Sequence, residues 1–204
     1  MKFSIQREVF LQPLSQVIGV VERRQTLPVL ANFLISSQDK TISITGTDME
    51  VELIASVTAD VSQEGETTVP ARKLVDIVRM LPDGAAISVL LEGDKLTVSS
   101  GPSRFTLSTL PATEFPATDH VETLEVFKIQ EHELKRLLDK TSFAMANQDV
   151  RYYLNGLLFE FSEGGLKTVA TDGHRLAVCD FDGELGVNYN RQMIVPRKGV
   201  LELA

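Results

Sequence analysis

The sequence repeats itself at a distance of 124 residues, and this repeat constrains the fold more than any other feature. Shifting the chain by that distance brings three pairs of segments into register: FSIQ (3–6) with FKIQ (127–130), ANFLIS (31–36) with NGLLFE (155–160), and Thr47-Asp48 with Thr171-Asp172. After a two-residue insertion, TTVPARKLVDI (67–77) meets MIVPRKGVLEL (193–203). The apolar and turn positions stay in step, so we expect one kind of domain used twice.

A weaker repeat divides the first copy into halves, because QDKTISITGTD (38–48) resembles GDKLTVSSGPS (93–103). Each half is predicted to run strand, helix, strand, strand, strand. Apolar residues at helical spacing predict helices over 7–22 and 71–81; Pro70 marks the start of the second, while Pro13 weakens the early turns of the first. Alternating strands indicate sheets covered on one side. The predicted fold class is therefore α+β, with helices on one face of antiparallel sheets.

The two copies differ in length. We expect a first domain over 1–116, a linker over 117–126 that follows the two prolines of PATEFPATDHVET (111–123), and a second domain over 127–204. The first copy continues for 46 residues after Pro70, whereas the second has 8 residues after Pro196. A sheet that stops there leaves unpaired edges. We therefore expect this chain to be the N-terminal portion of a longer protein.

The composition indicates a cytoplasmic protein. One cysteine excludes an internal disulfide, and neither a signal peptide nor an apolar segment long enough to span a bilayer is present. The formal charge of −8 argues against nucleic acid as a partner. However, the helical windows 7–24, 71–81, 131–141 and 196–204 hold 11 basic and 7 acidic residues, and the remaining 155 residues carry −12. This separation of charge fits helices that face a phosphate backbone, although ordinary solvated helix faces would explain it as well.

The stretch TVATDGHRLAVC (168–179) combines an acid, a histidine, an arginine and the single cysteine. Because TDGHRLAV occupies the repeat position of TDMEVELI, its Thr-Asp is explained as turn chemistry at the end of a strand. No nucleophile motif, metal-ligand spacing or phosphate-binding loop accompanies it, so we predict no catalytic residue, no metal site and no cofactor. A binding surface is the favoured interpretation, with Leu154 and Leu176 as its floor; a simple turn is the alternative.

A second stretch, ANQDVRYYLNG (146–156), places two tyrosines beside an arginine and two amide side chains. Tyrosines near such donors can stack on bases or bond phosphates. Packing of both rings beneath the loop is an equally good explanation at this point.

These motifs together resemble one family. TLPVLANFL, TGTDMEVEL, TTVPARK, RFTLSTLPATEFP, DVRYYLNGLLFE, TVATDGHRLAV and VPRKGV are similar to the DNA polymerase III β subunits, the replicative sliding clamps of bacteria. The resemblance covers the whole chain. It implies three similar domains per chain, of which the third is absent here, and a ring of two chains with helices inside and sheets outside.

The resemblance also implies roles for particular residues. Family positions that touch duplex DNA without reading its sequence correspond to Arg24, Gln148, Tyr152, Tyr153 and Lys198, with Arg79 and Arg197 as lesser candidates. A pocket for short peptides of the polymerase III catalytic subunit, the clamp loader and other clamp-binding proteins would include Leu154, Thr171, Gly173, His174, Arg175 and Leu176. The edge that joins two chains into a homodimeric ring would include Lys73, Arg104, Phe105 and Leu107, whose apolar members are expected to be exposed or to find a substitute contact.

The function expected on this basis is that of a processivity factor, which is not an enzyme, encircles DNA and does not bind membranes. Two alternatives remain open. One is a peptide-binding adaptor that never meets DNA. The other is a hydrolase that uses His174 and Asp172, which a loss of activity in His174→Ala would favour.

Overall fold

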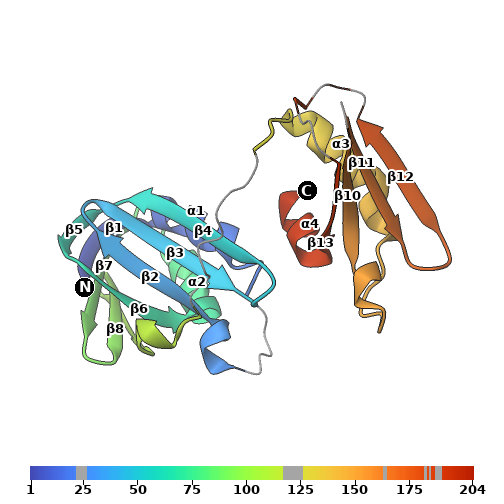
Figure 1. Cartoon of the computed structure of the whole chain (residues 1–204). Helices are drawn as coiled ribbons and strands as arrows, with labels where there is room; N and C mark the ends of the chain where they lie inside the picture. The colour runs from blue at the N-terminus through green and yellow to red at the C-terminus, as the bar shows by residue number, and fades with distance from the viewer. Residues whose placement is uncertain (22–26, 117–125, 163–164, 182, 184, 187–189) are drawn as a thin grey trace. The chain divides into compact units, whose positions relative to one another are not determined.

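The computed structural model describes residues 1–21, 27–116, 126–162, 165–181, 183, 185–186 and 190–204. The chain divides into two compact units, Met1–Asp119 (unit 1) and His120–Ala204 (unit 2), and each is a separate arrangement of helices and strands (Figure 1). Among the described residues, no helix has both the length and the apolar character needed to cross a bilayer.

Unit 1 runs through the predicted order of elements twice, with one added strand. Its elements are β1 (Lys2–Gln6), α1 (Arg7–Val17), the 3-10 turn η1 (Pro28–Ala31), β2 (Asn32–Gln38), β3 (Thr41–Thr47), β4 (Glu52–Thr58), the added β5 (Asp60–Gln63), β6 (Gly65–Pro70), α2 (Ala71–Met80), β7 (Ala86–Glu92), β8 (Lys95–Ser100), β9 (Ser103–Ser108) and the 3-10 turn η2 (Ala112–Glu114). Helix α1 continues through Pro13 but ends earlier than predicted, at Val17. Pro70 is the N-cap residue of α2.

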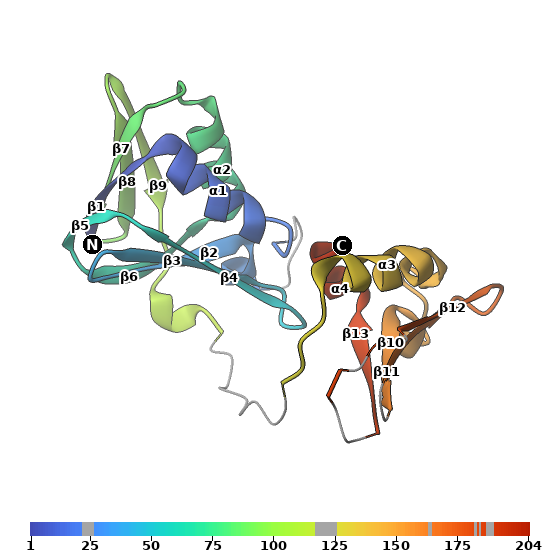
Figure 2. The same ribbon diagram turned by 90° about the horizontal axis from the view of Figure 1, so that it is seen from above.

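The two halves of unit 1 exchange strands. Strand β1 from the first half pairs with β7, and β6 from the second half pairs with β2. The result is a five-stranded sheet, β5-β1-β7-β8-β9, and a four-stranded sheet, β4-β3-β2-β6, both formed by antiparallel pairs (Figure 2). Because each sheet needs a strand from the other half, neither half of unit 1 completes a sheet alone.

One large hydrophobic core fills most of unit 1, with a small separate cluster of Val29, Leu30 and Phe115. Inward-facing residues of both sheets, such as Phe3, Ile44 and Val98, meet the buried faces of α1 and α2. Helix α1 packs on β3 and β4, and α2 packs on α1, β2 and β6. The outward side chains of the smaller sheet include polar ones such as Ser43, whose hydroxyl lies 2.9 Å from that of Ser56. The predicted α+β class, with helices on one face of antiparallel sheets, is thereby confirmed.

Unit 2 repeats part of this arrangement. Its elements are α3 (Glu131–Thr141), the 3-10 turns η3 (Ser142–Ala144) and η4 (Tyr152–Leu154), β10 (Gly156–Ser162), β11 (Gly165–Thr171), β12 (Leu176–Phe181), β13 (Arg191–Pro196) and α4 (Arg197–Leu203). The strand order β12-β11-β10-β13 matches β4-β3-β2-β6. The register matches as well: Leu34 pairs with Thr45 in unit 1, and their counterparts Leu158 and Val169 pair in unit 2.

The counterpart of β1 is an exception. Residues 126–130 form no strand, although they align with β1 in the sequence repeat. In unit 1, β1 is held between β5 and β7, and the described part of unit 2 has no strand corresponding to either. Without a neighbouring strand to pair its backbone N–H and C=O groups, this segment does not form a β-strand.

Candidate nucleic-acid interface and binding pocket

The acid in TDGHRLAV is a structural part of a turn between β11 and β12. The Asp172 Oδ1 atom accepts hydrogen bonds from the backbone N–H groups of His174 at 2.9 Å and Arg175 at 3.0 Å. Its Oδ2 atom accepts one from Arg175 Nε at 3.0 Å. These bonds, above all the one from the His174 N–H, hold the pKa of Asp172 below its ordinary value. The carboxylate is therefore engaged in shaping the turn.

Unit 1 contains the same turn without the reactive side chains. There Asp48 Oδ1 accepts from the N–H groups of Glu50 and Val51, and the Thr47 hydroxyl donates to the Val51 carbonyl at 2.9 Å. In unit 2 the Thr171 hydroxyl donates to the Arg175 carbonyl at 2.8 Å. Turn chemistry thus explains the Thr-Asp pair in both copies. Among the described residues, no group of His, Cys, Asp and Glu side chains is arranged to hold a metal ion.

The turn nevertheless presents side chains to solvent. His174 and Arg175 are exposed, and Leu176 is 66% exposed. The Arg175 guanidinium lies over the ring of Phe143, 5.6 Å from its centroid, a contact that sequence reasoning missed. Leu154 is buried, as a floor residue would be. The structure therefore brings the predicted turn residues together into an exposed polar and apolar edge.

The loop over 146–155 (the tyrosine loop) is held by its own hydrogen bonds. The Ala146 N–H donates to the Leu154 carbonyl at 3.0 Å and so closes the loop. Inside it, the Asp149 N–H donates to Asn155 Oδ1 at 2.9 Å, and Asn155 Nδ2 donates to the Asp149 carbonyl at 2.8 Å. The side chain of Asp149 also accepts from Arg151, through Nε at 3.0 Å and Nη2 at 2.9 Å. These bonds from Arg151 lower the pKa of Asp149 to about 2, so the pair stays ionised at neutral pH.

The loop displays its tyrosines outward. Tyr152 is 83% exposed and Tyr153 is 52% exposed, and their rings meet edge to face with centroids 6.1 Å apart. Packing of both rings beneath the loop is therefore the wrong explanation. Gln148 is also exposed and has a positive φ of 59°, which turns the chain sharply at that point. Asp149 and Asn155 hold the loop in this conformation, and the sequence alone did not identify either residue.

The start of α4 lies against the same loop. The Arg197 N–H donates to the Asn155 carbonyl at 2.9 Å, and Arg197 Nη1 donates to the Met145 carbonyl at 3.4 Å. Lys198 follows and is half-buried. Five of the predicted DNA-contact residues are thereby gathered on one part of unit 2: Gln148, Tyr152, Tyr153, Arg197 and Lys198.

The helices differ in the charge that they expose. On α2 the exposed positions include three cations, Arg72, Lys73 and Arg79, and one acid, Asp76. Helix α3 carries three cations and three acids, so its charges balance, and Arg136 forms an ion pair with Glu133 at 2.9 Å. Arg7 of α1 is turned inward, where its guanidinium donates to the carbonyls of Val78 and Arg79 at the end of α2. The positive surface predicted for all four helices is thus concentrated on α2 and at the start of α4. Arg24 lies outside the described residues.

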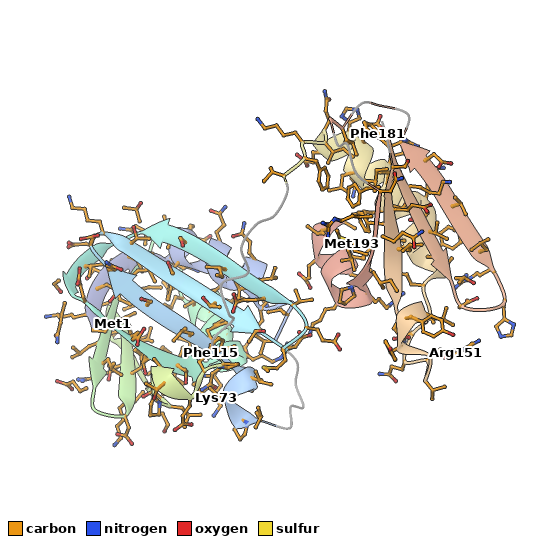
Figure 3. The ribbon with its side chains drawn as sticks, in the orientation of Figure 1. Met1, Lys73, Phe115, Arg151, Phe181 and Met193 are labelled. Atoms are coloured by element: carbon orange, nitrogen blue, oxygen red, sulfur yellow. The ribbon has the colours of Figure 1, made fainter. Side chains whose placement is uncertain are left out.

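The predicted ring edge is strand β9, which is an edge strand of its sheet. Arg104 is exposed and Phe105 is 38% exposed, as expected for such an edge. Lys73 is exposed on α2 (Figure 3). Leu107 is not exposed: it lies on the same face of β9 as Phe105, but it packs in the core of unit 1 beside Leu96 of β8 and is only 8% exposed.

Two family models match consecutive parts of the chain. Residues 1–119 match the N-terminal domain of the DNA polymerase III beta subunit, and residues 128–204 match the central domain of the same subunit. The beta sliding clamp of Pseudomonas aeruginosa is 55% identical over 205 residues, and that of Escherichia coli K12 is 53% identical over 205 residues. Both comparisons cover 100% of this chain and 56% of the relative, so the chain spans about half the length of these proteins.

Solved structures show the same similarity. The crystal structure of the DNA polymerase III subunit beta from Pseudomonas aeruginosa superposes with a TM-score of 0.93 at 53% identity, covering 100% of this chain and 55% of that one. The pol III beta of Caulobacter crescentus superposes with a TM-score of 0.92 at 41% identity, covering 99% of this chain and 56% of that one.

Proposed function

Because the chain belongs to the DNA polymerase III beta subunit family, we propose that it forms the N-terminal and central parts of a sliding clamp. Such a clamp encloses duplex DNA and tethers the replicative polymerase to it. The enclosure itself keeps the protein on DNA, so each contact to the backbone can be weak and independent of sequence. No step of this activity requires catalysis by the chain.

The observation that carries the proposal is that both units match consecutive domains of one family, each with the same strand order and register. The surface chemistry supports it. The cations of α2, the tyrosine loop and the start of α4 offer guanidinium, ammonium, hydroxyl and amide donors, which are the groups that bind phosphate oxygens. Their partner would be double-stranded DNA of any sequence.

We assign the protein partners to two further surfaces. The turn over 171–176, together with Leu154, would receive short peptides from the polymerase III catalytic subunit, the clamp loader and other clamp-binding proteins. The exposed edge of β9, with Arg104 and Phe105, would join a third domain of a second chain in a homodimeric ring. An edge strand with free backbone groups is suited to pairing with another chain.

The proposal predicts how DNA association depends on salt. Replacing Arg24 and Lys198 together by alanine is expected to weaken binding of a short duplex. The slope of log K against log salt should become shallower by about 1.8, because each lost phosphate contact removes about 0.9. Fluorescence anisotropy of a labelled duplex at several salt concentrations measures both quantities.

A matched control also removes two positive charges, but at positions outside the proposed DNA contacts. Lys40 lies in the turn between β2 and β3, and Lys167 lies on β11 between Glu160 and Asp180. Replacing these two lysines by alanine should leave the salt slope close to that of the unaltered chain. Equal slopes for all three proteins would favour the adaptor that never meets DNA.

A further inference from the structure

The backbone conformation of the turn does not by itself require glycine at position 173. Gly173 has a φ of 88°, a region that side chains disfavour. Its counterpart in unit 1 is Met49, which has a φ of 78° in a turn with the same hydrogen bonds and is 63% exposed. Because the turn of unit 1 accommodates a methionine there, backbone geometry alone does not account for the glycine of unit 2.

The neighbour of this position differs between the two units. A Cβ atom on Gly173 would lie 3.3 Å from Arg151 Nη2 and 3.5 Å from Arg151 Nη1. The distance to Nη2 is tighter than nine in ten real Cβ contacts, whereas the distance to Nη1 is an ordinary van der Waals contact, so the guanidinium would have to shift by a few tenths of an ångström. The counterpart of Arg151 in unit 1 is Leu27, which has no guanidinium to place. The Arg151 guanidinium therefore lies next to the position that a side chain at residue 173 would take.

Arg151 is in turn fixed to the tyrosine loop. Its Nε and Nη2 atoms donate to the two carboxylate oxygens of Asp149, and its own N–H donates to Asp149 Oδ1 at 2.8 Å. Asp149 is held by Asn155, whose carbonyl accepts the Arg197 N–H. A continuous set of contacts therefore leads from the turn through Arg151 to the loop and to α4. Figure 3 shows Arg151 on this loop at one end of unit 2.

We propose that Arg151 is a positioning residue that joins the turn over 171–176 to the tyrosine loop, and that Gly173 is small so that the guanidinium can lie against the turn. The inference rests on the proposed function, because the loop is taken to contact DNA. Its consequence is that the DNA-contacting loop and the peptide-binding turn of unit 2 form one connected surface. Whatever displaces the guanidinium at the turn also loosens the tyrosines.

The test replaces Gly173 and reads the effect at the loop. Gly173→Ala and Gly173→Asn are each expected to weaken association of the chain with a labelled short duplex at low salt. The loss should be about three- to tenfold, which lies at the lower end of the coupling expected for residues in contact. In an Arg151→Ala background the same changes should cause no further loss, because the group that they displace is already absent. Asparagine is included because it tolerates a positive φ better than alanine does.

Two measurements separate this role from a general loss of structure. The chain has three tyrosines and no tryptophan, so a Tyr189→Phe background leaves tyrosine emission to Tyr152 and Tyr153 alone. Emission and its quenching by iodide should change in the Gly173 variants, while the thermal unfolding of unit 2 changes little. Met49→Ala, at the matching position of unit 1, should alter neither emission nor DNA association.

The outcomes are distinct. Wild-type DNA association in the Gly173 variants, or an equal loss with and without Arg151, would overturn the inference while leaving the clamp intact. Wild-type association in variants of the tyrosines themselves would instead remove the proposed DNA contact on which the inference rests.

Discussion

Replacing Phe3 by alanine is expected to lower the free energy of unfolding of unit 1 by about 3–5 kcal/mol, the usual cost of removing a fully buried phenylalanine. Phe3 has no exposed surface and contacts Phe10 edge to face, with ring centroids 5.8 Å apart. It also lies on β1, the strand that the first half contributes to the sheet of the second half. The cavity would therefore open where the two halves interlock.

The sequence repeat supplies the control for this change. Phe127 occupies the matching position of unit 2, but it is half-buried and lies outside any strand. Phe127→Ala should cost less than Phe3→Ala and should affect unit 2 only. Differential scanning calorimetry, with each transition assigned by limited proteolysis, measures both effects. A larger effect at Phe127, or an unaltered transition for unit 1 in Phe3→Ala, would contradict the interlocked arrangement of β1.

Removing the hydroxyl groups of Tyr152 and Tyr153 together is expected to weaken duplex binding by about a hundredfold, or about tenfold for each hydroxyl. A hydrogen bond to a charged group contributes about 1.5–3 kcal/mol, and 1.4 kcal/mol corresponds to tenfold in affinity. Both hydroxyls are carried by exposed rings on a loop that Asp149 and Asn155 hold in shape. The salt slope should stay unchanged in Tyr152→Phe/Tyr153→Phe, because no charge is lost.

Alanine at the same two positions distinguishes the possible contacts. If the hydroxyls bond phosphates, the alanine pair should bind DNA no better than the phenylalanine pair. Wild-type binding by the phenylalanine pair together with weak binding by the alanine pair would indicate ring contacts instead, contrary to our assignment. Wild-type binding by both pairs would remove the loop from the DNA interface. The anisotropy assay used for the lysine and arginine variants measures all of these.

The repeat in the sequence predicted the local structure closely. The distance of 124 residues recurs in the strand register and in the hydrogen bonds of the two Thr-Asp turns. Such features depend on residues near one another in the chain, and the patterns of apolar and turn residues report directly on them. The same reasoning identified the turn as a candidate binding surface, but it left open whether the tyrosines of the tyrosine loop are exposed or packed beneath it.

Features that depend on distant residues were not predictable in this way. Alternation of apolar residues identifies a strand but not its partner, so the local sequence does not predict that β1 pairs with β7. The inward orientation of Arg7 follows from the end of α2, 71 residues away. The contact between Arg151 and the space at Gly173 likewise joins separate loops. Charge counted along the sequence therefore overstated the cationic surface of α1 and α3.

Retention on circular DNA tests the clamp proposal most directly. We would join residues 1–204 to the part of the Pseudomonas aeruginosa beta sliding clamp that this chain does not cover, and load the chimera onto a nicked circular plasmid with the clamp loader of that organism. Enclosure predicts that the protein stays on the circle at high salt and leaves when a restriction enzyme linearises the plasmid. Loss at the same rate before and after cutting would contradict enclosure.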